Sequence, residues 1–130
     1  MPKKVLVVDD EMDARTYIST LLESNGYRAV TAEDGEQGWE KFQKELPALV
    51  TLDVMMPKES GIKLYRAIKT HGEYCGVPVV VVSGLAKKTF LHSQGVLDRF
   101  KGENVPEPEG YIEKPPEAEE LLNEVRRLIG

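Results

Sequence analysis

Short apolar runs alternate along this chain with longer amphipathic segments, and this alternation constrains the fold more than any other feature. Residues 5–8 (VLVV), 48–52 (ALVTL) and 77–82 (VPVVVV) are continuous apolar runs, typical of strands that are covered on both faces. Between them, hydrophobic residues recur at helical spacing, as in residues 13–22 and 34–45. The pattern therefore predicts that strands and helices take turns along the chain.

The remaining elements complete the same pattern. Residues 27–31 and 111–112 read as two further strands, and Ser60 reads as the N-cap of a third helix. Apolar stripes over residues 90–100 and 118–129 predict the last two helices. Parallel strands joined by right-handed helical crossovers give an α/β sandwich. We therefore expect a flavodoxin-like (βα)5 fold with a five-stranded parallel sheet of order 2-1-3-4-5 and helices on both faces.

Composition narrows the class of protein. A length of 130 residues favours a single domain spanning residues 1–130, and 30% charged residues argue against a disordered chain. The net charge of −5 does not favour binding to nucleic acid. The apolar run at residues 5–8 is too short for a signal peptide or a membrane span. With Cys75 as the single cysteine, no internal disulfide can form, so we expect a cytoplasmic protein in which Cys75 is buried as a small hydrophobe.

Polar side chains follow the ends of four predicted strands. Asp9 and Asp10 come directly after the first strand and Asp53 after the third, while Ser83 follows the fourth and Lys114 the fifth. The carboxyl ends of parallel strands lie at one edge of the sheet, where ligands of open α/β sheets bind near the switch in strand order. The sequence therefore predicts that all five side chains face one crevice.

Three carboxylates in one crevice repel one another, so each resists ionisation beside the others. A hard divalent cation such as Mg²⁺ removes the conflict, because it binds carboxylates together with waters and phosphate oxygens. An aspartate can also act as a nucleophile and form an acyl phosphate, helped by a metal, a lysine and a hydroxyl. The pattern therefore indicates phosphoryl transfer to Asp53.

Each of these residues also has an ordinary explanation. Asp9 and Asp10 could cap the first helix, Ser83 could bond its own backbone and Lys114 could be a solvated surface residue. Their joint placement at strand ends favours a site instead. Three other residues receive structural interpretations only, as surface residues or as packing: His71, His92 and Trp39.

Four segments together, VLVVDDE, LDVMMP, VVVVSG and YIEKP, resemble the signature segments of the response regulator receiver domain of two-component signalling. The resemblance implies that Asp53 is phosphorylated by a sensor histidine kinase or a histidine phosphotransfer protein, with Mg²⁺ or Mn²⁺ as cofactor. It implies metal ligation by Asp10, Asp53 and the backbone carbonyl of Met55, with Asp9 acting directly or through water.

The resemblance also assigns the switch. Ser83 matches the hydroxyl that reorients towards the phosphoryl group, Lys114 matches its basic partner and Tyr111 matches the aromatic switch residue. The bond between Lys114 and Pro115 is usually cis in this family. The structural positions of the motifs are Pro57, Gly61 and Pro115.

Three alternatives remain beside a phosphorylated receiver. A haloacid-dehalogenase-like phosphatase would need a second acid where Met55 stands, and a flavin or dinucleotide carrier would need a glycine-rich loop where DDEMD stands. A degenerate receiver would bind partners without phosphorylation, but this chain retains the acids and the lysine. We expect no enzymatic activity beyond the receiver's own phosphorylation and dephosphorylation.

The segment between Ser83 and Lys114 departs from the family pattern. The two residues are 31 positions apart, and KGENVPEPEG (residues 101–110) predicts a mobile loop without regular structure. The helix before it carries more apolar residues than the sheet needs. We therefore expect the face formed by residues 85–112 to bind a downstream protein or a second copy of the chain, and we expect no output domain within these 130 residues.

Overall fold

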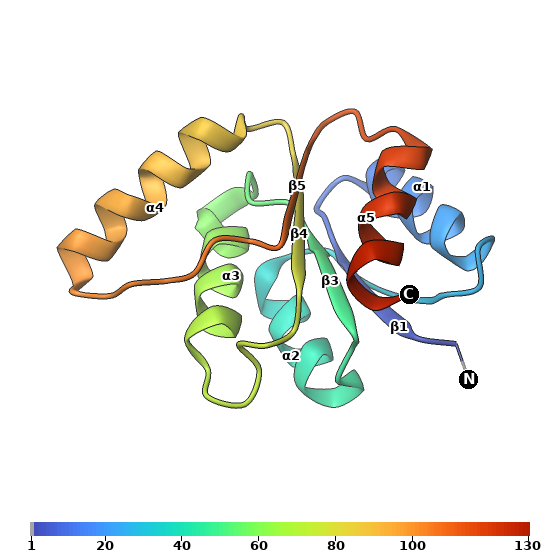
Figure 1. The fold of residues 1–130 in the computed structure, drawn as a ribbon, viewed down its shortest axis with the longest axis horizontal. Helices are drawn as coiled ribbons and strands as arrows, with labels where there is room; N and C mark the ends of the chain where they lie inside the picture. The colour runs from blue at the N-terminus through green and yellow to red at the C-terminus, as the bar shows by residue number, and fades with distance from the viewer. Residues whose placement is uncertain (1) are drawn as a thin grey trace.

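A parallel five-stranded sheet forms the central layer of the computed structural model, which describes residues 2–130 (Figure 1). The spatial order is β2-β1-β3-β4-β5, as the sequence predicts, and all four neighbouring pairs are parallel. The strands are β1 (Lys4–Val8), β2 (Arg28–Ala32), β3 (Leu49–Leu52), β4 (Val79–Ser83) and β5 (Gly110–Glu113).

Helices cover both faces of the sheet. Alternate side chains of β1 separate two cores: Val5 and Val7 pack with α1 and α5, whereas Leu6 and Val8 pack with α2, α3 and α4. This alternation follows from the two-residue period of a strand, and the apolar character of β1 after Lys4 follows from burial on both sides. The helices are α1 (Met12–Glu23), α2 (Gly35–Glu45), α3 (Ser60–Thr70), α4 (Lys87–Lys101) and α5 (Ala118–Ile129), with a 3-10 turn η1 (Pro57–Glu59) before α3.

Ser60 does not cap α3 as the sequence predicted. It is the first residue of that helix, and its hydroxyl accepts a hydrogen bond from the Gly35 amide at 3.1 Å, which links the starts of α2 and α3. A Cβ atom at Gly35 would lie 2.0 Å from the Ser60 carbonyl oxygen, so this contact requires glycine. The start of α2 is capped, because the Asp34 carboxylate accepts from the Gln37 amide.

The turn between α3 and β4 corrects a second expectation. Cys75 is exposed there rather than buried, because the turn lies outside the two helical layers. His92 is exposed, as expected of a surface residue, whereas His71 is partly buried and stacks on Tyr74 with ring centroids 4.1 Å apart. Trp39 packs against Phe42 with centroids 6.0 Å apart, as expected of a packing residue.

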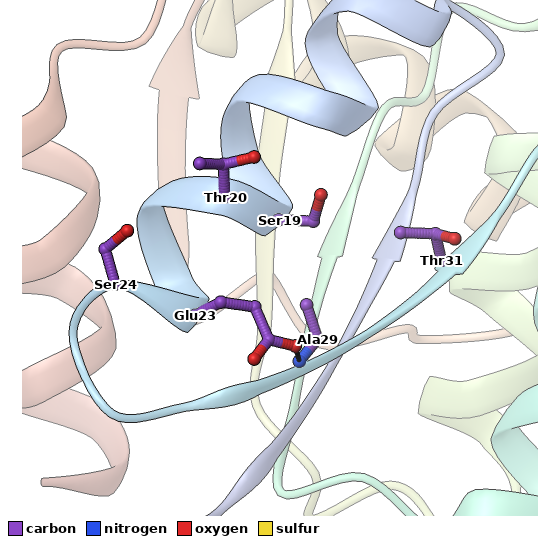
Figure 2. A pocket seen from close by; sticks show the side chains of 6 residues that line it. All are labelled: Ser19, Thr20, Glu23, Ser24, Ala29 and Thr31. Atoms are coloured by element: carbon purple, nitrogen blue, oxygen red, sulfur yellow. Dashed lines mark hydrogen bonds between the residues drawn. The ribbon is translucent and has the colours of Figure 1, made fainter.

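Side chains protect the free edge of β2, one of the two edge strands of the sheet. The Ala29 amide of β2 donates to Glu23 Oε1 at 2.8 Å, and the Thr31 carbonyl accepts from Lys41 Nζ at 2.5 Å (Figure 2 shows the Glu23 contact). Such capping blunts an edge strand that could otherwise pair with another chain. A hollow of about 440 Å³ opens here, and the strand-end carboxylates do not line it.

The segment after α4 has no regular structure from residue 103 to 108, as predicted, but side chains of α3 hold it. In Figure 1, α4 projects away from the sheet and the chain returns past α3 to β5. As expected, α4 carries more apolar side chains than it packs against the sheet: Phe100 of this helix is 87% exposed. Over residues 2–130, no helix has the length and apolar character needed to cross a membrane.

Candidate functional site

The carboxyl ends of β1 and β3 fix two buried aspartates side by side. The Asp9 amide donates to the Ala32 carbonyl at 3.1 Å, and the Asp53 amide donates to the Val8 carbonyl at 3.0 Å. Each acid is therefore held by the strand next to its own. Asp9 is 1% exposed and Asp53 is 3% exposed, which is rare for carboxylates without partners.

Four acids converge at this point. One carboxylate oxygen from each of Asp9, Asp10, Glu11 and Asp53 lies within 4.8 Å of the others. The structure thus brings the three predicted aspartates together and adds Glu11, which the sequence pattern did not single out. Glu11 directly follows the aspartate pair, and its amide donates to Asp9 Oδ1 at 3.0 Å, so its place in the chain was the available signal.

Lys114 supplies the positive charge. Its Nζ lies 2.9 Å from Asp53 Oδ2, 2.8 Å from Glu11 Oε1 and 2.9 Å from Asp9 Oδ2. Its amide donates to the Ser83 carbonyl at 2.8 Å, which ties the end of β5 to the end of β4. Burial opposes the charge, but the contacts with Glu11, Asp9 and Asp53 raise the pKa of Lys114 above its usual value. The side chain is therefore an ammonium ion.

Asp9 retains an unsatisfied oxygen. Burial raises the pKa of Asp9, while the hydrogen bond from the Glu11 amide and the positive charge of the nearby Lys114 act in the opposite direction. Although Asp9 Oδ2 is close to Lys114 Nζ, it has no partner with hydrogen-bond geometry within residues 2–130. A buried acceptor among four carboxylates suits a hard cation with oxygen ligands. Asp9, Asp10, Glu11 and Asp53 are thus the residues that could hold Mg²⁺ or Mn²⁺.

Ser83 and Tyr111 meet at the backbone of Leu85. The Leu85 amide donates to Ser83 Oγ at 3.2 Å, and the Tyr111 hydroxyl donates to the Leu85 carbonyl at 2.6 Å. Burial raises the pKa of Tyr111 to about 12, so the phenol stays a donor at neutral pH. Ser83 is fully buried, and within the described residues its hydroxyl is bonded to Leu85, not to Asp53. The structure thus joins the two predicted switch residues but leaves Ser83 outside the acidic cluster.

The remaining predicted residues shape the loops around Asp53. The Met55 amide donates to Asp53 Oδ1 at 2.8 Å, while metal binding by the Met55 carbonyl stays a prediction. A Cβ atom at Gly61 would lie 2.2 Å from the Asp53 carbonyl oxygen, so only glycine fits there. Pro57 begins η1, and the peptide bond between Lys114 and Pro115 is cis, as the family resemblance implies.

Sequence comparison identifies the class. Residues 5–126 match the family model of the response regulator receiver domain. The chain belongs to this family, whose members are signalling modules of response regulators and generally not enzymes.

Similar proteins support the assignment. The chain is 36% identical over 127 residues to the protein named "Probable transcriptional regulator ycf27" of Cyanophora paradoxa, covering 98% of this chain and 48% of that protein. It is 31% identical over 129 residues to the response regulator MprA of Mycolicibacterium vanbaalenii, covering 99% of this chain and 51% of MprA. The chain therefore spans about half the length of these relatives.

Solved structures share the fold. The chemotaxis response regulator CheY4 of Vibrio cholerae aligns with a TM-score of 0.82 at 26% identity, covering 99% of this chain and 100% of CheY4. A receiver domain from Clostridium thermocellum aligns with a TM-score of 0.76 at 27% identity, covering 98% of this chain and 94% of that one. The predicted flavodoxin-like architecture is thus confirmed.

Proposed function

We propose that this receiver domain is a switch operated by phosphorylation of Asp53. The observation that carries the proposal is the placement of Asp53, a buried carboxylate next to Lys114 and within reach of three further acids. We assign the metal to Asp9, Asp10, Asp53 and the Met55 carbonyl. When bound, Mg²⁺ or Mn²⁺ would neutralise the charge of the carboxylates and of the incoming phosphoryl group.

The chain's own residues orient the acceptor. The Met55 amide holds Asp53 Oδ1 and the Lys114 ammonium holds Oδ2, so the carboxylate has a fixed direction. A carboxylate oxygen of Asp53 forms the new bond to phosphorus while the bond from phosphorus to the donor nitrogen or oxygen breaks. The electron pair of that bond leaves with the donor. Lys114 is then placed to pair with the transferred phosphoryl group.

The rim of the site supports a protein donor. Asp53 is buried, so a phosphohistidine must be presented by a domain that covers the rim. Met12 and Tyr17 of α1 are exposed, and a hollow of about 610 Å³ runs from Tyr17 to Lys114 and Pro115. An apolar rim beside the acceptor suits docking of a histidine kinase or a histidine phosphotransfer protein.

The output is the face formed by residues 85–112. A phosphoryl group offers acceptor oxygens to the Ser83 hydroxyl, which accepts from the Leu85 amide and can still donate its own proton to a phosphoryl oxygen. Tyr111 is bonded to the same residue, so it would respond as well. Exposed Phe100 gives this face an apolar contact for a downstream protein or a second copy. The net charge of −5 favours a protein partner over nucleic acid for these 130 residues.

Acetyl phosphate labelling tests the proposal. Intact-mass measurement should show one phosphoryl adduct with Mg²⁺ and none with excess EDTA. Asp10→Asn should need a higher Mg²⁺ concentration for the same labelling. A degenerate receiver would acquire no adduct under any of these conditions, and that result would favour binding without phosphorylation.

A further inference from the structure

Glu11 occupies the N-cap position of α1, yet its side chain makes no cap hydrogen bond. An acid at this position would suit the positive end of the helix dipole. Instead, Glu11 Oε1 lies 2.8 Å from Lys114 Nζ, which belongs to a residue 103 positions later in the chain. The Glu11 amide donates to Asp9 Oδ1 and its carbonyl accepts from the Arg15 amide, so the backbone below the side chain is fixed. The Glu11 carboxylate is therefore directed at the cation of the site and not at its own helix.

The three acids around Lys114 Nζ differ in exposure. The side chains of Asp9 and Asp53 are 2% and 3% exposed, whereas the side chain of Glu11 is 66% exposed. Lys114 itself is 15% exposed. Asp9 and Asp53 thus contact the ammonium from the inside of the site, and Glu11 contacts it from the solvent side. A small molecule that reaches Lys114 and Asp53 from solvent must pass beside the Glu11 carboxylate.

The opening of the site is negatively charged. The hydrogen bond from Lys114 lowers the pKa of Glu11, so this carboxylate is ionised at neutral pH. Asp10 and Asp13 are further exposed acids of the same stretch, and Asp13 lines the hollow beside Glu11 and Lys114. Arg15 is the cation of this stretch, but it is partly buried and donates to a backbone carbonyl at 2.9 Å. The exposed charges before Lys114 are therefore mostly negative.

Lys114 cannot serve Glu11 and an incoming phosphoryl group equally well. Its Nζ donates to Asp53 on the inside and to Glu11 on the outside. An oxygen of an incoming phosphoryl group needs a strong donor of this kind. The contact with Glu11 lies on the side from which a small donor arrives, so it is the contact to be exchanged. An anionic donor must therefore compete with Glu11 for the ammonium and is repelled by the same carboxylate.

We propose that Glu11 is a specificity-determining residue that disfavours free phosphodonors of high negative charge and favours donors of lower net negative charge. It acts by holding Lys114 from the solvent side and by repelling anions at the opening. This inference rests on the proposed function, because it concerns the choice of donor for phosphorylation of Asp53. Ligation of the metal by Glu11 is the competing role, and the two roles predict opposite effects of removing its charge.

The rate of labelling by acetyl phosphate tests this role. The phosphoryl group passes to an oxygen of Asp53, and acetate leaves with the electron pair of the broken bond to phosphorus. Intact-mass measurement would follow the initial rate at saturating Mg²⁺ and a low donor concentration. Glu11→Gln should be labelled about fivefold faster than the wild-type protein, because one repulsive charge and one competitor for Lys114 are lost. Glu40→Gln, an exposed position of α2 with the same change in net charge, should match the wild type.

Donor charge and salt provide readouts that a purely structural role of Glu11 would not change. Phosphoramidate carries a protonated nitrogen and hence less net negative charge than acetyl phosphate. Its gain in Glu11→Gln should be smaller, about twofold, because the repulsion scales with the charge of the donor. Raising the salt concentration from about 0.05 M to about 0.5 M should shrink the gain for acetyl phosphate, because the carboxylate is exposed and its field is screened.

The outcomes separate this inference from the proposed function. If the wild-type protein is labelled but Glu11→Gln is labelled at the same rate or more slowly by acetyl phosphate, the role of Glu11 is overturned and the proposed phosphorylation stands. Slower labelling would instead favour Glu11 as a metal ligand. Equal gains with both donors, or a gain that salt does not reduce, would also overturn selection by charge. If neither donor labels the wild-type protein in the presence of Mg²⁺, the proposed function fails and this inference fails with it.

Discussion

Lys114 Nζ lies 2.9 Å from Asp53 Oδ2, so the residue that would accept a phosphoryl group is already paired with a cation. The same ammonium contacts Glu11 and Asp9, and these contacts keep it charged. One lysine therefore balances several carboxylates, of which those of Asp9 and Asp53 are buried. A divalent cation entering the site must share these oxygens with Lys114.

Removing this competitor should strengthen metal binding. Lys114→Met deletes a positive charge beside the acids, so we expect Mg²⁺ to bind about five- to tenfold more tightly, corresponding to roughly 1 kcal/mol of relieved repulsion. Isothermal titration calorimetry would measure the affinity. Lys88→Met, at an exposed position of α4, should leave it unchanged. Unchanged or weaker binding in Lys114→Met would mean that the lysine does not oppose the metal.

The close approach of Gly61 to Asp53 predicts a second outcome. Gly61→Ala would place a Cβ atom 2.2 Å from the Asp53 carbonyl oxygen and 2.8 Å from Val54 Cα. The backbone must shift, which should lower the free energy of unfolding by about 1–3 kcal/mol. Gly72→Ala is the matched control, because a Cβ atom at Gly72 would have no neighbouring atom within 4 Å. Urea denaturation would compare the two, and equal stabilities would show that the site tolerates the shift.

The sequence predicted the acidic cluster because the carboxyl ends of parallel strands share one edge of the sheet. Glu11 was missed because it reads as the start of a helix, although its side chain turns back to Lys114. Ser60 was assigned to the wrong role because its hydroxyl meets Gly35, a partner 25 residues away. The ion pairs of Arg66 with Glu103 and of Lys69 with Glu109 were not predictable, because both glutamates lie in a segment without a regular pattern.

The buried pair of Lys69 and Glu109 should respond unequally to its two deletions. Glu109→Gln leaves a fully buried ammonium without its counter-charge, so the free energy of unfolding should fall by about 3 kcal/mol or more. Lys69→Met fills the same space with an apolar chain, and Glu109, whose side chain is 33% exposed, can turn to water. Its cost should therefore be clearly smaller. Thermal or urea unfolding with equal losses for both variants would contradict this account.

The residues beside the acceptor predict a long-lived acyl phosphate. Met55 and Leu85 flank the approach to Asp53 and Ser83, and neither side chain can orient an attacking water. We expect self-dephosphorylation over minutes or longer. Met55→Asn and Leu85→Glu should each speed the decay by about tenfold or more, because each adds a group that can position water. Loss of the phosphoryl adduct can be followed by mass spectrometry, and unchanged decay in both variants would place the barrier elsewhere.

Mapping the phosphoryl group after treatment with acetyl phosphate and Mg²⁺ tests the central claim most directly. Peptide mass spectrometry should find the group on Asp53 in the wild-type protein. Asp53→Asn keeps the size of the side chain but lacks the nucleophilic carboxylate, so it should remain unlabelled. Equal labelling of Asp53→Asn, or a phosphoryl group mapped to another residue in the wild-type protein, would contradict the assignment of Asp53 as the acceptor.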